Sequence, residues 1–211
     1  MPGAPNRPPE NAPEPTPAPP VAISPRQKAL FRLVPSRTAL LLEAWKGTPS
    51  PELVDPLDRA EAAFDRGEFD AAVNALELLS VRFAEPRWPS LPEPFKLLRV
   101  PIPAPMPPHW NPDHALAPAE REARRARREA DEQLQLAAGS IGWAAPHGVD
   151  TAEAARALAE ARAILGAEGV VPAFYERMET TWTELRRRLP RPRSAKDRAP
   201  APTPEAEAGE A

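Results

Sequence analysis

The sequence predicts an all-α protein: a compact bundle of about five to seven helices within a chain of 211 residues. Two observations lead to this prediction. Apolar residues between positions 24 and 189 recur at spacings of three and four, the period of a helix that buries one face. The 32 prolines, which interrupt helices, gather mainly in residues 1–25, 86–118 and 190–211. The segments between these clusters are therefore left to form the helices.

The first helix is expected to begin at Ser24, where Pro25 suits the first helical position and Gln27 completes a capping box. Apolar side chains then line one face of the helix: Leu30, Phe31, Val34, Leu41, Leu42 and Trp45. Pro35 removes a backbone hydrogen bond and disfavours helical geometry at the residue before it. We therefore expect a kink or two short helices here.

Residues 51–85 contain two apolar stripes separated by the short segment Arg66-Gly67-Glu68. The first stripe is expected to start where Pro56 follows Asp55, a capping residue followed by proline. Helices joined by so short a turn run antiparallel, and Gly67 is expected to adopt a positive φ. The two stripes consist of Leu57, Ala60 and Phe64, and of Phe69, Ala72, Val73, Leu76, Leu79 and Phe83.

Residues 60–76 follow a fixed order: a small residue, an aromatic, a glycine, an acid, an aromatic and a second small residue. The residues concerned are Ala60, Phe64, Gly67, Glu68, Phe69, Asp70, Ala72, Val73 and Leu76. This pattern resembles a single tetratricopeptide repeat, and no second copy follows at the 34-residue period of that family. The resemblance implies a helical hairpin of a kind that binds peptides and proteins.

Residues 86–112, the strap, combine ten prolines with many large apolar side chains, so the strap cannot form an α-helix. Two arrangements would bury its apolar side chains: the strap packs as an extended segment on its own bundle, or it docks to a partner. Packing on the bundle is favoured, because a permanently exposed apolar segment would invite aggregation. For the second outcome the predicted partner-binding residues are Trp88, Phe95, Leu98, Ile102 and Trp110.

Three further helices are predicted after the strap. The first spans residues 115–138 with an alanine-rich seam, and the glycines of residues 139–148 indicate a turn. The second runs from about 151 to 165, with Asp150 and Glu153 as a capping box. The last begins at proline 172 and carries Phe174, Met178, Trp182, Leu185 and Leu189 on one face.

Residues 1–23 and 190–211 have almost nothing to bury, which predicts disordered tails around one helical domain at 24–189. The segment 186–198 carries seven basic groups against Asp197. Five arginines there are candidate contacts for phosphates or an acidic partner: Arg186, Arg187, Arg188, Arg191 and Arg193. The basic first helix is also expected to pair with the acidic hairpin 51–85 within the fold.

The composition excludes several classes of function. There is no cysteine, and therefore no disulfide or thiolate metal site. No apolar run is long enough to cross a membrane, and the three histidines lack the spacing of a metal or catalytic site. No phosphate-binding glycine loop is present. The sequence thus predicts no catalytic, metal-binding or cofactor-binding residue.

The function expected on these grounds is a non-enzymatic protein-interaction or scaffold protein of a prokaryotic cytoplasm, with a protein or peptide partner. The alternative is a nucleic-acid-associated protein that uses the basic segment 186–198. An enzyme of unrecognised type is the third hypothesis.

Overall fold

The computed structural model describes residues 22–46, 50–85, 91–98 and 116–192. These residues form six α-helices and two 3-10 helices and contain no strand, which confirms the predicted all-α bundle. The α-helices are α1 (Pro25–Lys46), α2 (Pro51–Asp65), α3 (Phe69–Ala84), α4 (Pro118–Ala144), α5 (Ala152–Ala167) and α6 (Pro172–Arg188), and the 3-10 helices are η1 (Phe95–Leu98) and η3 (Ala145–His147). The predicted tails lie almost entirely outside the described residues.

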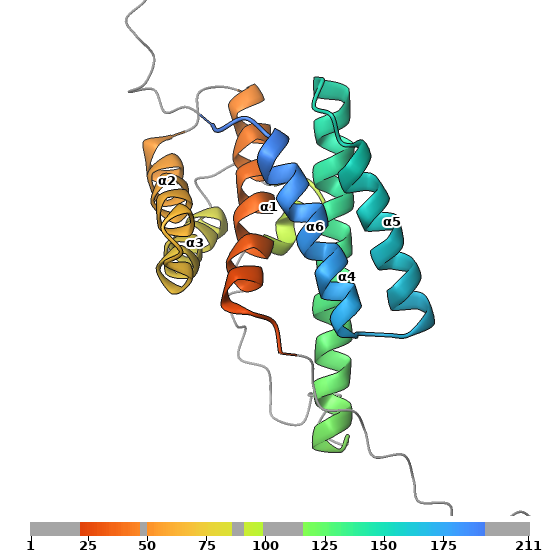
Figure 1. Cartoon of the computed structure of the whole chain (residues 1–211). Helices are drawn as coiled ribbons and strands as arrows, with labels where there is room; N and C mark the ends of the chain where they lie inside the picture. Colours follow the sequence, from red (N-terminus) through yellow and green to blue (C-terminus); the bar gives the residue numbers. More distant parts are fainter. Residues whose placement is uncertain (1–21, 47–49, 86–90, 99–115, 193–211) are drawn as a thin grey trace, which may run out of the picture.

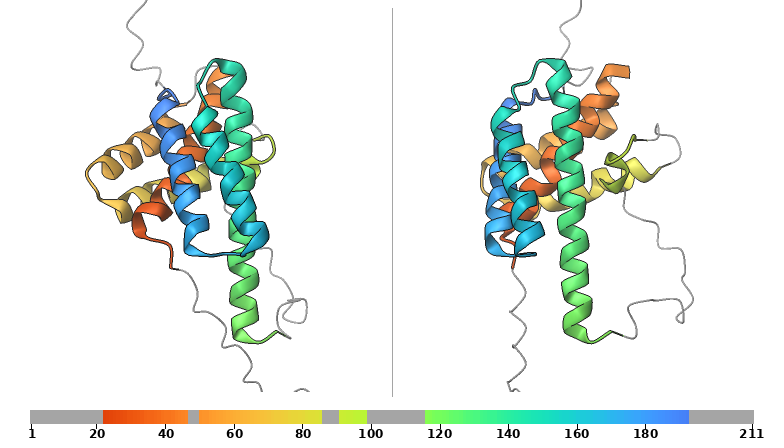
Figure 2. Two further views of the ribbon diagram at one scale, coloured as in Figure 1. Left: turned by 45° about the vertical axis from the view of Figure 1, so that its right-hand side comes forward. Right: turned by 90° about the vertical axis from the view of Figure 1, so that its right-hand side faces the viewer.

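Helix α1 lies in the middle of the molecule and packs against α2, α3, η1, α4 and α6. The α2–α3 hairpin lies on one side of α1, and α4, α5 and α6 lie on the other (Figure 1). The N-terminal half of α4 projects beyond the other helices (Figure 2), and every side chain from 117 to 125 is exposed. The buried core draws on all six α-helices, with α1 between the two groups.

The predicted capping box opens α1. The Gln27 amide donates to Ser24 Oγ at 3.1 Å, and the Ser24 amide donates to Gln27 Oε1 at 3.0 Å. The expectation of two short helices is wrong, because α1 is one helix that contains Pro35. Proline removes one intrahelical hydrogen bond, but nearly all side chains from 29 to 41 are buried between the hairpin and the other helices. Tertiary packing outweighs the local penalty.

Helix α2 begins earlier than predicted, at Pro51 rather than near Pro56. Ser50 is the N-cap, and its hydroxyl accepts from the Glu52 amide at 3.3 Å. Two signals of one kind, a capping residue before a proline, thus occur five residues apart. The second of these prolines is buried within the helix, where it loses a single hydrogen bond near the N-terminus.

The hairpin turn forms as predicted. Gly67 has a φ of 78°, a conformation that strains residues with a Cβ atom. Phe64 and Phe69 meet edge to face across the turn, with ring centroids 5.4 Å apart. Ala60 and Ala72 are fully buried, so α2 and α3 pack on small residues at these positions.

The described part of the strap, residues 91–98, packs on the bundle, with Leu91 and Phe95 buried in the core. It forms one 3-10 turn, η1, rather than a fully extended chain. Pro94 lies against α4 so closely that a Cβ atom on Gly139 would be 2.5 Å from its Cδ. The predicted turn at 139–148 is therefore wrong at its start, where Gly139 lies inside α4. The chain does turn at the end of this segment, where Gly148 has a φ of 76°.

Helix α6 buries the predicted face, and Trp182, fully buried at its centre, donates its indole N–H to Gln133 of α4 at 3.2 Å. The predicted capping box of Asp150 and Glu153 is not formed: Thr151 is the N-cap of α5, Asp150 accepts from the Ala152 amide at 3.2 Å, and Glu153 pairs with Arg156. None of the helices in the described residues combines the length and apolar composition that crossing a bilayer requires.

Candidate partner-binding groove

A groove of about 820 Å³ lies where α3 and η1 face the base of the projecting half of α4. Phe31 of α1 and Tyr175 of α6, both buried, form its floor. Its apolar and aromatic lining residues are Ile23, Phe31, Val81, Leu97, Leu98, Leu136 and Tyr175. We call this site the groove.

In the part of the chain that the structure describes, the groove contains apolar side chains that are exposed. Among the described residues only three large apolar side chains are strongly exposed: Leu78 at 56%, Val81 at 54% and Leu97 at 40%. Val81 and Leu97 line the groove, whereas Leu78 does not. Adjacent exposed apolar side chains in a concave site are typical of surfaces that bind a partner.

The floor of the groove is rigidly packed. Phe31 stacks on Tyr175 with ring centroids 6.4 Å apart and planes at 22°, and both residues are buried. Burial raises the pKa of Tyr175, with a smaller contribution from Glu129, so its hydroxyl stays neutral at physiological pH. A preformed aromatic floor spares a partner the entropic cost of ordering the site.

The two rims of the groove differ in charge. The α1 rim carries Lys28 and Arg32, whereas the α4 rim carries Glu129 and Glu132. Arg32 pairs with Glu77 of α3 at 3.2 Å, and Glu129 pairs with Arg125 at 2.9 Å. Within the described residues neither Lys28 nor Glu132 forms an ion pair. Each rim therefore presents one uncompensated charge, positive on α1 and negative on α4.

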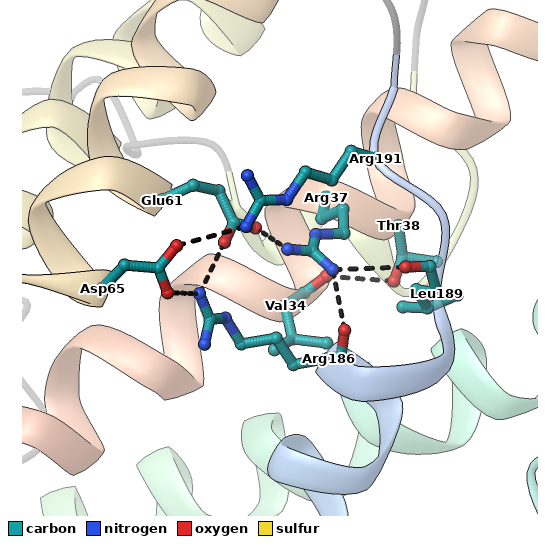
Figure 3. Close-up of polar contacts among 8 residues, drawn as sticks. All are labelled: Val34, Arg37, Thr38, Glu61, Asp65, Arg186, Leu189 and Arg191. Carbon is teal, nitrogen blue, oxygen red and sulfur yellow. Dashed lines mark hydrogen bonds and ion pairs between the residues drawn. The ribbon is translucent and has the colours of Figure 1, made fainter.

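A polar clamp on another face of α1 joins the hairpin to α6 (Figure 3). Its centre is an ion pair between Arg37 and Glu61, whose side chains are each only 3% exposed. The Arg37 guanidinium also donates to the carbonyls of Arg186 and Leu189, at 2.8 and 3.3 Å. It thus satisfies carbonyl groups that the end of α6 leaves without helical partners.

Two more arginines complete the clamp, which we define as Arg37, Glu61, Asp65, Arg186 and Arg191. Arg186 bridges both carboxylates, 2.8 Å from Glu61 and 2.6 Å from Asp65. Its guanidinium carbon lies 4.5 Å from the centre of the Phe64 ring, within the range of a cation–π contact. Arg191 pairs with Asp65 at 3.1 Å. The predicted pairing of the basic first helix with the acidic hairpin is confirmed by two ion pairs, Arg37 with Glu61 and Arg32 with Glu77.

The ionisation of the clamp follows from these contacts. The hydrogen bond from Arg186 holds the pKa of Asp65 below its ordinary value. Burial lowers the pKa of Arg37, and Glu61 opposes this change. Arginine begins so far above neutrality that Arg37 remains a cation.

The predicted partner-binding residues fall into two groups. Trp88, Ile102 and Trp110 lie outside the described residues. Phe95 is buried in the core, 2% exposed, and so supports η1 from within. Leu98 is partly buried and lines the groove. Of the predicted set, the described structure therefore places one residue in the groove.

The predicted basic residues are used within the fold. Arg186 and Arg191 belong to the clamp, Arg187 pairs with Glu184 at 2.6 Å, and Arg188 approaches Asp150 to 3.5 Å. Arg193 lies outside the described residues. Each of the four described arginines therefore has a carboxylate partner.

Sequence reasoning missed Val81, Leu97, Lys28 and Glu132. One signal was available: Leu78 and Val81 are apolar residues three positions apart that lie off the buried stripe of α3. The two charges carried no local signal, because their rims come together only in the folded chain. Within the described residues no group of three or more acidic or histidine side chains could hold a metal ion.

Comparison with protein-family models, with curated proteins and with solved structures finds no match to this chain. The arrangement of the described residues is accordingly the basis for assigning a function.

Proposed function

We propose that this protein is a non-enzymatic interaction module that binds an amphipathic helix of a partner protein in the groove. The observation that carries the proposal is the exposure of Val81 and Leu97 in a concave site with a packed aromatic floor. Burial of such side chains by a partner would contribute about 1.5–3 kcal/mol each if it were complete. Leaving them in water gives the folded chain no comparable benefit.

The walls of the groove favour a helix as the ligand. They are provided largely by α1, α3 and α4, and helices bind amphipathic helices by placing an apolar face in the groove between them. One wall, α3, belongs to the hairpin that resembles a tetratricopeptide repeat. The free charges of the rims then define the partner further: an acidic side chain toward Lys28 and a basic side chain toward Glu132.

The alternative, a nucleic-acid-associated protein, has less support. It relies on the arginines of residues 186–198, and the four that are described already pair with carboxylates. A nucleic-acid strand needs a continuous track of available cations, and pairing of the successive arginines with separate carboxylates interrupts such a track. A cytoplasmic location remains part of the proposal, and its support is the absence of cysteine.

The proposal can be tested by affinity purification of the full chain from its native cells. Val81→Asp and Leu97→Asp each place a carboxylate in the groove, and both positions are exposed enough for the fold to tolerate it. Leu78→Asp is the matched control for Val81→Asp, because Leu78 lies on the same helix as Val81 and is about equally exposed, but lies outside the groove. We expect a partner protein to be retained by the wild type and by the control and lost by both groove variants.

Two results would contradict the proposal. If all three variants retained the same proteins, the groove would not be the binding site. If the wild type bound duplex DNA with a steep dependence on salt, and the groove variants bound equally well, the nucleic-acid hypothesis would replace it.

A further inference from the structure

A second hollow, of about 380 Å³, lies between the N-terminal half of α1, the end of α2 and the end of α6. Five arginines line it: Arg26, Arg37, Arg186, Arg187 and Arg191. We call it the arginine hollow. At 100° per residue, Arg26, Leu30 and Arg37 lie on the side of α1 opposite to the groove residues Lys28, Arg32 and Ser36. The hollow and the groove are therefore separate sites.

The hollow carries an excess of positive charge. In the clamp three guanidinium groups share two carboxylates, Glu61 and Asp65, so one positive charge is not neutralised. Arg26 pairs with Glu179 and Arg187 with Glu184, which leaves the excess unchanged. Only the loss of a proton from an arginine could remove this excess, and arginine does not lose its proton at neutral pH.

Three of the arginines also have unused hydrogen-bond donors. The side chains of Arg26, Arg187 and Arg191 are 50%, 62% and 61% exposed. Each gives only one guanidinium nitrogen to a carboxylate within the described residues. A guanidinium has five N–H groups in a planar fork that suits the oxygens of a phosphate group. Arg37 and Arg186, which form the base of the hollow, each donate a hydrogen bond to Glu61.

The shape of the site favours one phosphate group over a nucleic-acid strand. A strand needs a track of cations and usually aromatic faces for its bases. Arg188, the next arginine on α6, does not line the hollow and approaches Asp150 instead. The only aromatic ring in the hollow, Phe64, is covered by Arg186.

From these observations we propose that the arginine hollow binds a single phosphate group, held by Arg26, Arg187 and Arg191 over the base formed by Arg37 and Arg186. The group can come from a phosphorylated side chain of a protein or from free phosphate. The proposal does not depend on the groove, since different residues of α1 line the two sites.

The test uses the full chain labelled for NMR, with arginine Nε–H resonances as the readout. The probes are inorganic phosphate, an alanine-based peptide with one phosphoserine, and the same peptide without phosphate. We expect saturable shifts at Arg187 and Arg191 with both phosphate probes and none with the plain peptide. Tighter binding of the phosphopeptide than of phosphate would identify a phosphorylated protein as the source, and equal affinities would identify free phosphate.

Variants locate the site. Arg187→Ala and Arg191→Ala should each weaken phosphate binding about tenfold, the loss expected for one charge-assisted contact. Arg187 lies outside the clamp, so its variant separates lost binding from a loosened fold. Arg188→Ala, at the same helix end but outside the hollow, should bind as the wild type does. The proposal is overturned if phosphate causes no saturable shift, if Arg188→Ala loses as much affinity, or if only duplex DNA binds.

Discussion

The clamp and the groove lie on different faces of α1 and invert the usual distribution of polarity. On the clamp face, charged side chains are buried: Arg37 and Glu61 are as inaccessible as the leucines around them. On the groove face, Val81 of α3 and Leu97 of η1 are exposed to solvent beside the packed floor. Helix α1 thus borders a buried polar contact on one face and, on another, a groove in which side chains of α3 and η1 are exposed.

The difference separates what holds the fold from what is free to bind. A buried ion pair adds little net stability compared with apolar packing, but removing one partner is costly, so it fixes which helices meet. Exposed apolar residues contribute little to the stability of the isolated chain. They contribute to the free energy of binding when a partner covers them. The clamp therefore positions the hairpin, and the groove uses the hairpin as a wall.

The largest expected loss of folding stability comes from a substitution in the clamp. Glu61→Ala leaves Arg37 buried without its carboxylate and deprives Arg186 of one partner. Uncompensated buried charge typically costs about 3–5 kcal/mol, so the free energy of unfolding in urea should fall by that amount.

A double variant sharpens this prediction. Arg37→Met with Glu61→Leu removes both charges and keeps comparable volume, so it should be less destabilising than Glu61→Ala alone. It should not restore full stability, because the carbonyls of Arg186 and Leu189 lose their donor. If the single variant unfolded at the urea concentration of the wild type, the clamp would have no role in holding the hairpin.

A smaller effect is expected on the groove face, at the contact that seats η1. Gly139→Ala would place a Cβ atom 2.5 Å from the ring of Pro94, and overpacking of this kind costs about 1–3 kcal/mol. Gly142→Ala, three residues further along the same helix, meets open space and should instead stabilise α4 by about 1 kcal/mol. Thermal unfolding of the two variants should therefore shift in opposite directions. Shifts of equal sign would mean that Pro94 does not press on α4.

The smallest effect is the pH dependence of the clamp. Arg186 lowers the pKa of Asp65 in the folded chain, so this contact stabilises the fold above the unfolded pKa of about 3.9. The contribution is lost as pH falls through the lower folded pKa. Because Asp65 is 47% exposed, solvent screening limits it to about 1 kcal/mol or less. The free energy of unfolding of Asp65→Asn should fall below that of the wild type at pH 6, and the difference should shrink as the pH is lowered toward 2. A difference that did not change with pH would exclude this role.

Local signals in the sequence predicted the parts of the fold that depend on neighbours along the chain. The capping box at Ser24, the turn at Gly67 and the buried face of α6 are all set by residues within a few positions. The errors at Pro35 and Gly139 have the opposite cause. Proline is kept inside α1 by burial, and glycine is required inside α4 by a proline more than forty residues away. Neither partner is visible from the local sequence.

The site was less predictable than the fold for the same reason. The groove combines side chains of α1, α3, η1, α4 and α6, and of the residues predicted to bind a partner only Leu98 lies in it among those described. The charge of the first helix and of the hairpin predicted that they would pair, but did not identify Arg37 and Glu61. Arg37 and Glu61 differ from the other charged residues in being buried, and burial depends on the folded structure.

Whether a partner occupies the groove can be decided by site-specific photo-crosslinking in native cells. A photoreactive amino acid is placed at Val81 in one variant and at Leu78 in another, two exposed positions three residues apart on α3. We expect a discrete adduct from Val81 to an amphipathic helix of another protein, and no such adduct from Leu78. Equal adducts from both positions, or none from Val81 while the chain is folded, would contradict it.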